Sequence, residues 1–227
     1  MFTVSPIPKS KLQTRYIAPF GLTVLLHQGK PGESIESFWI GGSESEPGIV
    51  LFVSALDAEI YRLHALTLGQ EWVRHPLEAI GFQYTVETLG KAWTNLVFAF
   101  NANARGELLR GQSGCLLLPH YQECFGPLGQ PSAPVTFKFD ERTFETMEER
   151  WNLMGEPDHA GTIAKMNALG TTAAGAAQLQ GIAEKALGRV TIGPVGEPIH
   201  EAIDYATFNP HTSRWSYGPN EARQILH

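Results

Sequence analysis

The sequence predicts an α+β fold in which a mixed, mainly antiparallel sheet is flanked by helices. Continuous apolar runs of strand length occur at 49–53 and 96–100, whereas the charged segment after Phe139 repeats its apolar residues at helical spacing. Composition agrees with a packed domain, because 43% of the 227 residues are hydrophobic and 12 are Phe. The 23 Gly and 15 Pro predict many turns between these elements.

The N-terminal part of the chain predicts mostly strands. Residues 1–20 contain three Pro and several Lys and Arg, which is typical of an extended arm. Strands are expected at 22–27 and 37–40. From 82 to 119 the pattern again favours strands, and the turn-rich segment 101–106 joins two of them in a hairpin.

The clearest local unit is a strand, a tight turn and a helix. Residues 49–53 are apolar throughout, as in a buried central strand. Ser54 follows with Asp57 three residues later, which resembles a capping box, and Gly69 is placed to end the helix. The residues spaced to form the apolar side of this helix are Leu56, Ile60, Leu63 and Leu66.

A segment rich in Pro and Gly, 125–134, is the best candidate for a linker. The sequence therefore allows an N-terminal α+β subdomain at 1–130 and a helix-rich subdomain at 131–227, or one continuous domain. Beyond the linker, 135–139 predicts a strand and the next segment a helix. The apolar stripe of that helix is formed by Phe144, Met147, Trp151 and Met154.

Residues 160–188, rich in Ala, Gly and Thr, predict two helices that break near Gly170. Thr172 or Thr171 is placed to cap the second helix. The small residues of this helix let another element approach closely. The tail at 189–219 predicts strand and loop, and 220–226 predicts a short final helix.

Charge and cysteine content exclude several classes of function. A net charge of −6 leaves no basic stripe for nucleic acid, but it suits docking onto a basic protein. Cys115 and Cys124 are the only cysteines, and no signal peptide is evident, so we expect a reduced, cytoplasmic protein. No apolar stretch approaches the ~20 residues that span a bilayer, so we expect no membrane partner.

Compact catalytic motifs are incomplete in this chain. In Gly111–Cys115, Cys115 replaces the second Gly of a nucleophile elbow. In the run His200-Glu201-Ala202-Ile203-Asp204, Asp204 replaces the second His of a zincin helix. These gaps favour a binding protein over a catalyst, and we expect no cofactor and no bound metal.

An enzymatic alternative nevertheless remains open at two places. On a helix, His200, Glu201 and Asp204 would present three metal ligands on one face. The alternative is an acid-rich first helical turn, because negative side chains favour a helix N-terminus. If the segment between them is helical, His120 and Cys124 would share a face as a base and a nucleophile. The alternative is a partly buried thiol near a surface histidine.

Two other segments also have two interpretations. Asp158 and His159 are either an acid–base couple or, as we expect, a helix cap followed by a solvent-facing histidine. Trp215 and Tyr217 lie in an aromatic segment near the C-terminus, and Trp and Tyr dominate binding hot spots. They are equally suited to packing over the edge of the core.

The strongest charge feature lies on the helix predicted after Phe139. Five acids occur within ten residues, against one basic residue, Arg142. Such a surface fits the positive active-site cleft of a nuclease or of another basic partner, while the alternative is a solvated face. These acids are Asp140, Glu141, Glu145, Glu148 and Glu149.

In overall character the chain resembles the bacterial immunity proteins that neutralise polymorphic or type VI secreted toxins. The strand–Ser54–helix unit and the acidic helix after Phe139 are compatible with this resemblance, which covers the whole chain in character but carries over no family residue. The resemblance implies a non-enzymatic inhibitor whose partner is a cognate toxin. The enzymatic alternative is a small hydrolase or metal-dependent enzyme, and a homodimer is expected on general grounds.

Overall fold

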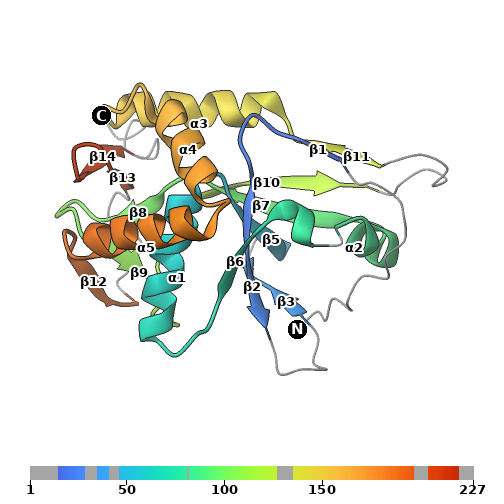
Figure 1. Ribbon diagram of the computed structural model, residues 1–227, viewed down its shortest axis with the longest axis horizontal. Coiled ribbons are helices and arrows are strands. Elements are labelled where there is room, and N and C mark those ends of the chain that lie inside the picture. Colours follow the sequence, from blue (N-terminus) through green and yellow to red (C-terminus); the bar gives the residue numbers. More distant parts are fainter. Residues whose placement is uncertain are drawn as a thin grey trace.

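The computed structural model confirms the α+β class, with helices packed around mixed, mostly antiparallel sheets (Figure 1). Within the described residues, strands form a seven-stranded, a five-stranded and a two-stranded sheet. Most of the predicted linker, the start of the predicted arm and the predicted helix at 220–226 lie outside those residues. The described residues are 15–28, 35–40, 46–80, 82–126, 135–196 and 204–219.

The seven-stranded sheet has the order β10-β7-β5-β2-β3, with β4 paired to β5 and β6 paired to β2. Its centre is β5, every residue of which is buried, as the apolar run predicted. β5 and β7 are parallel, and the other pairs in this sheet are antiparallel. Its strands are β2 (Thr23–Gln28), β3 (Ile35–Ser37), β4 (Trp39–Ile40), β5 (Gly48–Phe52), β6 (Val73–Pro76), β7 (Ala92–Val97) and β10 (His120–Phe125).

The five-stranded sheet has the order β12-β9-β8-β13-β14, and β14 lies at its edge. The strand predicted at 96–100 is divided between the two large sheets, because the chain leaves one after Val97 and enters the other at Phe100. The five strands are β8 (Phe100–Ala102), β9 (Leu108–Arg110), β12 (Ile192–Val195), β13 (Asp204–Asn209) and β14 (Arg214–Pro219). A separate parallel pair consists of β1 (Arg15–Ile17) and β11 (Thr136–Lys138).

Five α-helices occur within the described residues, and none of them is long and apolar enough to cross a membrane. The strand pattern predicted from residue 82 was wrong at its start, where α2 forms instead. Phe82 and Val86, one helical turn apart, are both buried, so the spacing that decides this segment is helical. The helices are α1 (Ala55–Thr67), α2 (Phe82–Leu89), α3 (Glu141–Leu153), α4 (His159–Leu169) and α5 (Ala173–Leu187), with a short 3₁₀ turn at Leu77–Ala79.

Local capping signals define the ends of two helices as predicted. The hydroxyl of Ser54 accepts a hydrogen bond from the Asp57 amide at 3.3 Å and begins α1. Gly69 follows α1 with a φ of +78°, a conformation that favours glycine. The hydroxyl of Thr172 accepts from the Gly175 amide at 3.1 Å and begins α5 after the predicted break.

Two apolar clusters form the core, and each combines residues from before and after 127–134. One cluster joins α1 and α5 to both large sheets, and the other lies beneath α3 and the β1–β11 pair. The division into subdomains at residue 130 stays a prediction. The second cluster contains the whole predicted stripe of α3, namely Phe144, Met147, Trp151 and Met154.

Helix α1 is enclosed more completely than its sequence predicts. α4 and α5 pack against it, as do β2, β5 and β6, so the first two turns are surrounded. Asp57, Glu59 and His64 are consequently buried. The predicted apolar stripe was wrong at its far end, because Leu66 is 46% exposed where the helix extends beyond these neighbours.

Candidate functional site

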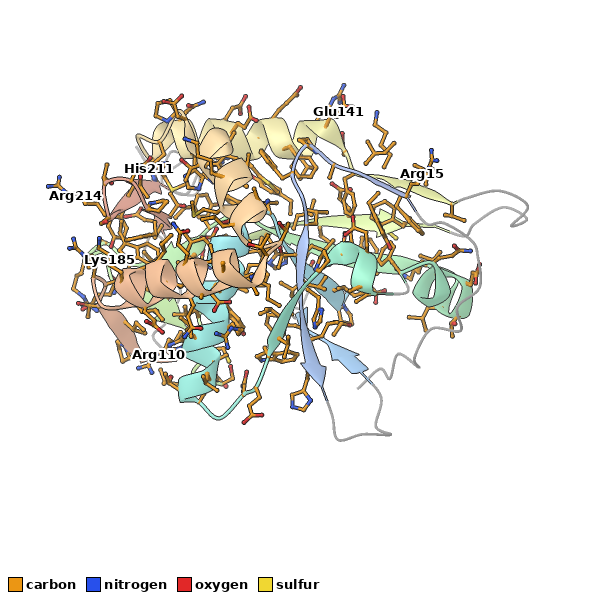
Figure 2. The ribbon with its side chains drawn as sticks, viewed as in Figure 1. Arg15, Arg110, Glu141, Lys185, His211 and Arg214 are labelled. Atoms are coloured by element: carbon orange, nitrogen blue, oxygen red, sulfur yellow. The ribbon has the colours of Figure 1, made fainter. Side chains whose placement is uncertain are left out.

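The predicted acidic segment forms the N-terminal cap and exposed side of α3. The Asp140 carboxylate accepts a hydrogen bond from the Arg142 amide at 3.1 Å and begins the helix. Figure 2 shows Glu141 on the outer side of α3, away from the sheets. We call the five exposed acids the acidic face of α3: Asp140, Glu141, Glu145, Glu148 and Glu149.

Helical spacing gathers four of these carboxylates on one side of α3. Positions 141, 145, 148 and 149 lie within about 100° around the helix axis, opposite the buried stripe. Glu141 forms an exposed ion pair with Lys138 at 3.0 Å. The side chains of the other three acids have no ion pair or hydrogen bond with any described residue. Whether this face binds a partner stays a prediction.

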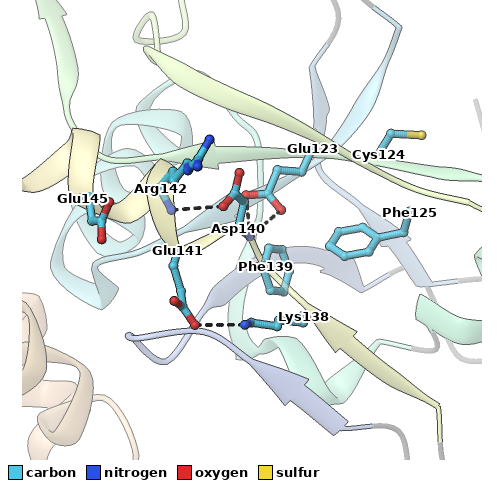
Figure 3. Close-up of a pocket in the computed structure, with 9 residues that line it drawn as sticks. All are labelled: Glu123, Cys124, Phe125, Lys138, Phe139, Asp140, Glu141, Arg142 and Glu145. Atoms are coloured by element: carbon cyan, nitrogen blue, oxygen red, sulfur yellow. Dashed lines mark hydrogen bonds and ion pairs between the residues drawn. The ribbon is translucent and has the colours of Figure 1, made fainter.

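A groove of about 570 Å³ opens beside the N-terminus of α3 (Figure 3). One wall is the end of β10, and the other runs from β11 into the first turns of α3. The rings of Phe125 and Phe139 meet edge to face, with 5.0 Å between their centroids. We call this the acidic groove, and its lining residues are Glu123, Cys124, Phe125, Lys138, Phe139, Asp140, Glu141, Arg142 and Glu145.

The electrostatics of the acidic groove favour a cationic group. Both carboxylate oxygens of Glu123 accept a hydrogen bond from the Asp140 amide at 3.3 Å. Burial raises the pKa of Glu123, while hydrogen bonds from the Asp140 amide and from the Thr143 hydroxyl oppose that rise. Two carboxylates therefore already occupy the positive end of the α3 dipole. With four carboxylates and two basic side chains around it, the groove suits a guanidinium or ammonium group.

The alternative that places His120 and Cys124 together on one helical face is not supported, because the segment is strand β10 and not a helix. Four residues along a strand span ~13 Å, which is too far for a histidine to deprotonate the thiol directly. His120 instead places its Nδ1 atom 3.0 Å from the carbonyl oxygen of Leu118. Cys124 is exposed at the rim of the acidic groove.

The other predicted catalytic motifs gain no support. Gly111–Cys115 forms a tight turn after β9, with the Gly111 amide bonded to the Cys115 carbonyl, and not a strand-to-helix elbow. His200 and Glu201 lie outside the described residues, and Asp204 begins strand β13. Within the part of the chain that the structure describes, no group of three or more His, Cys, Asp or Glu side chains is arranged to hold a metal ion.

Trp215 and Tyr217 lie on edge strand β14, apart from the acidic face. The indole of Trp215 donates to the Ala186 carbonyl at 2.9 Å, so it packs against α5. Tyr217 points to the same side of the strand and keeps 37% of its surface exposed. Ser216 between them points the other way and donates to Glu156 just beyond α3. The structure therefore does not bring the aromatic pair together with the acidic face.

His159 was predicted to face solvent, and this prediction was wrong. The side chain is only 3% exposed, since it is covered by the Trp151 ring at 5.0 Å and by β13. Its Nε2 atom lies 3.0 Å from the Thr207 hydroxyl, and its Nδ1 atom has no hydrogen-bond partner among the described residues. Burial lowers the pKa of His159 to about 4. Asp158 occupies the cap position of α4, but its side chain makes no capping bond.

Asp57 is a second buried ionisable group that the sequence did not identify as special. It is 2% exposed, and its Oδ2 atom finds no hydrogen-bond partner within the described residues. Burial raises the pKa of Asp57 to about 7. Nearby on α1, Glu59 is also buried, but it is paired with Arg62 at 2.7 Å and with Arg74 at 3.6 Å.

No family model, curated protein or solved structure matches this chain. Its function is therefore inferred from the described geometry. Within the described residues, the acidic face of α3 is exposed and adjoins the acidic groove.

Proposed function

We propose that this chain is a non-enzymatic inhibitor of the immunity-protein kind, which neutralises a cognate bacterial toxin such as a nuclease. The acidic face of α3 would lie over the toxin's basic active site and exclude its substrate. One observation carries the proposal. Glu145, Glu148 and Glu149 are exposed on one side of α3 without a described intramolecular partner, while the opposite side of the same helix is core.

Such a row of charges is unfavourable within the free protein. Glu145 lies four residues from both Glu141 and Glu149, and like charges at this spacing destabilise a helix by ~0.2–0.5 kcal/mol per pair. A basic partner converts this repulsion into attraction. The association rate with such a partner also rises, because complementary charge steers the two proteins together.

A nuclease is the natural class of target for such a surface. Its active-site cleft must attract the phosphates of a nucleic acid, so it carries Lys and Arg side chains. Carboxylates on successive turns of α3, ~6 Å apart along the axis, present a rod of negative charge to that cleft. Burying the rod there excludes the substrate without any chemical step.

The proposal is tested by co-expression with the product of the adjacent gene in a susceptible host. We expect the adjacent product alone to stop growth, and co-expression to restore growth with both chains purifying as one complex. Continued killing together with separate purification would contradict the proposal. Survival without a complex would point instead to chemical inactivation of the toxin or its substrate.

The enzymatic alternative has no comparable support within the described residues. His120 and Cys124 are separated along a strand, and no described cluster has the composition of a metal site. Elemental analysis of the purified protein and the reactivity of Cys124 distinguish the alternatives. A stoichiometric metal, or a thiol that titrates well below ~8.5, would favour an enzyme.

A further inference from the structure

Among the described residues, strand β10 has an open edge beside the acidic groove. It pairs with β7 on one side, and no other described strand pairs with it. Its last three residues, Glu123, Cys124 and Phe125, form one wall of the groove (Figure 3). An unpaired strand edge presents a row of backbone N–H and C=O groups that can pair with another chain.

The side chains of β10 hold this edge in place. Tyr121 stacks on Phe98 with 5.3 Å between ring centroids, and Phe125 meets Phe139 edge to face. Glu123, between them on the same side of the strand, accepts from the Asp140 amide. Three contacts thus fix the strand to the core beneath α3, so its edge is an ordered template.

The negative charge of the acidic groove determines which kind of molecule can bind at the open edge of β10. A second copy of the chain would bring an identical set of carboxylates against the first, which is repulsive. A nucleic acid is repelled for the same reason. An extended segment rich in Arg or Lys is attracted, and its backbone can pair with β10.

We propose that the open edge of β10 takes an extended, basic segment of the partner protein as an added strand. This inference rests on the proposed function and deepens it by naming the kind of segment that is recognised. Every second side chain of the added strand would point to the side occupied by Glu123. Arg suits these positions, because its planar guanidinium pairs with carboxylates through two parallel hydrogen bonds.

The experiment uses the full chain and a synthetic peptide with blocked ends, Arg-Val-Arg-Val-Arg-Val, as long as the six-residue β10. The readout is the rate at which a maleimide modifies the exposed thiol of Cys124. At about ten times the dissociation constant, the peptide should slow this reaction about tenfold, because only unoccupied protein reacts. Cys115, beside Gln70 in another loop, is the internal control and should react at an unchanged rate.

Two methylated peptides separate strand addition from simple charge attraction. Each keeps all side chains but carries N-methyl groups on one of the two alternate sets of amides. Strand addition predicts that one methylated peptide loses protection of Cys124 and the other keeps it, because alternate amides face opposite edges. Replacing Glu141 and Glu145 by Gln should weaken protection by the parent peptide.

Two results would overturn the inference. One is equal protection by all three peptides, which would mean that charge alone attracts the segment. The other is no protection by the parent peptide at any concentration up to its solubility limit. Neither result bears on rescue by co-expression, so failure of the strand-addition inference is distinguishable from failure of the proposed function.

Discussion

Helices α1 and α3 have the same length, 13 residues, and each follows a strand and begins at a side-chain cap. Their acidic residues have opposite environments. Asp57 and Glu59 of α1 are buried, whereas the acidic face of α3 is exposed along the helix. The two helices therefore place the same kind of residue in different environments.

The difference arises from what packs around each helix. In Figure 1, α5 crosses the upper part of α1, whose far end reaches the lower margin, whereas α3 runs along the upper margin with one side covered. Carboxylates on α1 must be paired, as Glu59 is, or held neutral, as burial favours for Asp57. Carboxylates of the acidic face of α3 are exposed to solvent. The packing around each helix, and not the type of residue, decides whether its carboxylates are buried or exposed.

The largest expected effect concerns the covered side of α3. Trp151 is buried and its indole donates to the Phe98 carbonyl at 3.1 Å. Replacing Trp151 by Ala should lower the free energy of unfolding by ~3–5 kcal/mol, since a large cavity and an unpaired carbonyl remain. Chemical denaturation measures this. Glu148→Ala, on the exposed side, is the control and should change stability by less than ~0.5 kcal/mol. Similar values for both variants would contradict the division of α3 into two sides.

The next effect concerns Asp57. Its pKa rises from 3.8 in the unfolded chain to about 7 in the folded protein. The folded state therefore binds more protons between these values, and stability falls as the pH rises through about 7. Asp57→Asn should remove this loss and stabilise the protein at pH 8 by up to ~4 kcal/mol. Urea denaturation at pH 8 measures the change, and a less stable variant would mean that the ionised carboxylate is favourably held.

His159 should produce a slope of opposite sign. Its pKa falls from 6.5 to about 4 on folding, so the unfolded chain binds more protons between these values. The contribution of His159 to the free energy of unfolding is complete above pH 6.5. Up to ~3 kcal/mol of it is lost as the pH falls towards 4. Because the slope from Asp57 opposes it over this range, single variants separate the two. On acidification from pH 6.5 to 4.5, Asp57→Asn should lose stability and His159→Gln should gain it. Parallel pH profiles for these variants would contradict the assignments.

The elements that the sequence predicts well are those with short-range signals. Ser54 and the apolar run before it define β5 and the start of α1, and Thr172 defines the break before α5. For α3, helical spacing alone distinguishes the buried side from the exposed side, because the apolar stripe that begins at Phe144 is the buried side. The position of the acidic face could therefore be predicted from the sequence, because the same helical spacing places these acids on the exposed side.

The features that the sequence did not predict depend on distant contacts. Asp57 has an ordinary position for a helix N-terminus, and the elements packed around its helix include two that begin more than 100 residues later, α4 and α5. His159 is buried by Thr207 and by Trp151 on other elements. The acidic groove requires β10 and α3 to meet across the segment at 127–134. Only pairing with β7 reveals that β10 is a strand, since its own residues do not alternate between apolar and polar.

The most direct test of the account is the association rate of a variant with Glu145, Glu148 and Glu149 replaced by Gln. The binding partner to be tested is the product of the adjacent gene, as in the co-expression experiment. The control changes net charge equally but elsewhere, through Gln at the exposed Glu71, Glu78 and Glu184.

At low salt the α3 variant should associate at least ~10-fold more slowly than the control. Its free energy of unfolding, measured by thermal unfolding, should change by less than ~0.5 kcal/mol per charge pair. The difference should nearly vanish near ~1 M salt, where the Debye length is ~3 Å. Equal association rates for the two variants at low salt would contradict the account and direct the search to Trp215 and Tyr217.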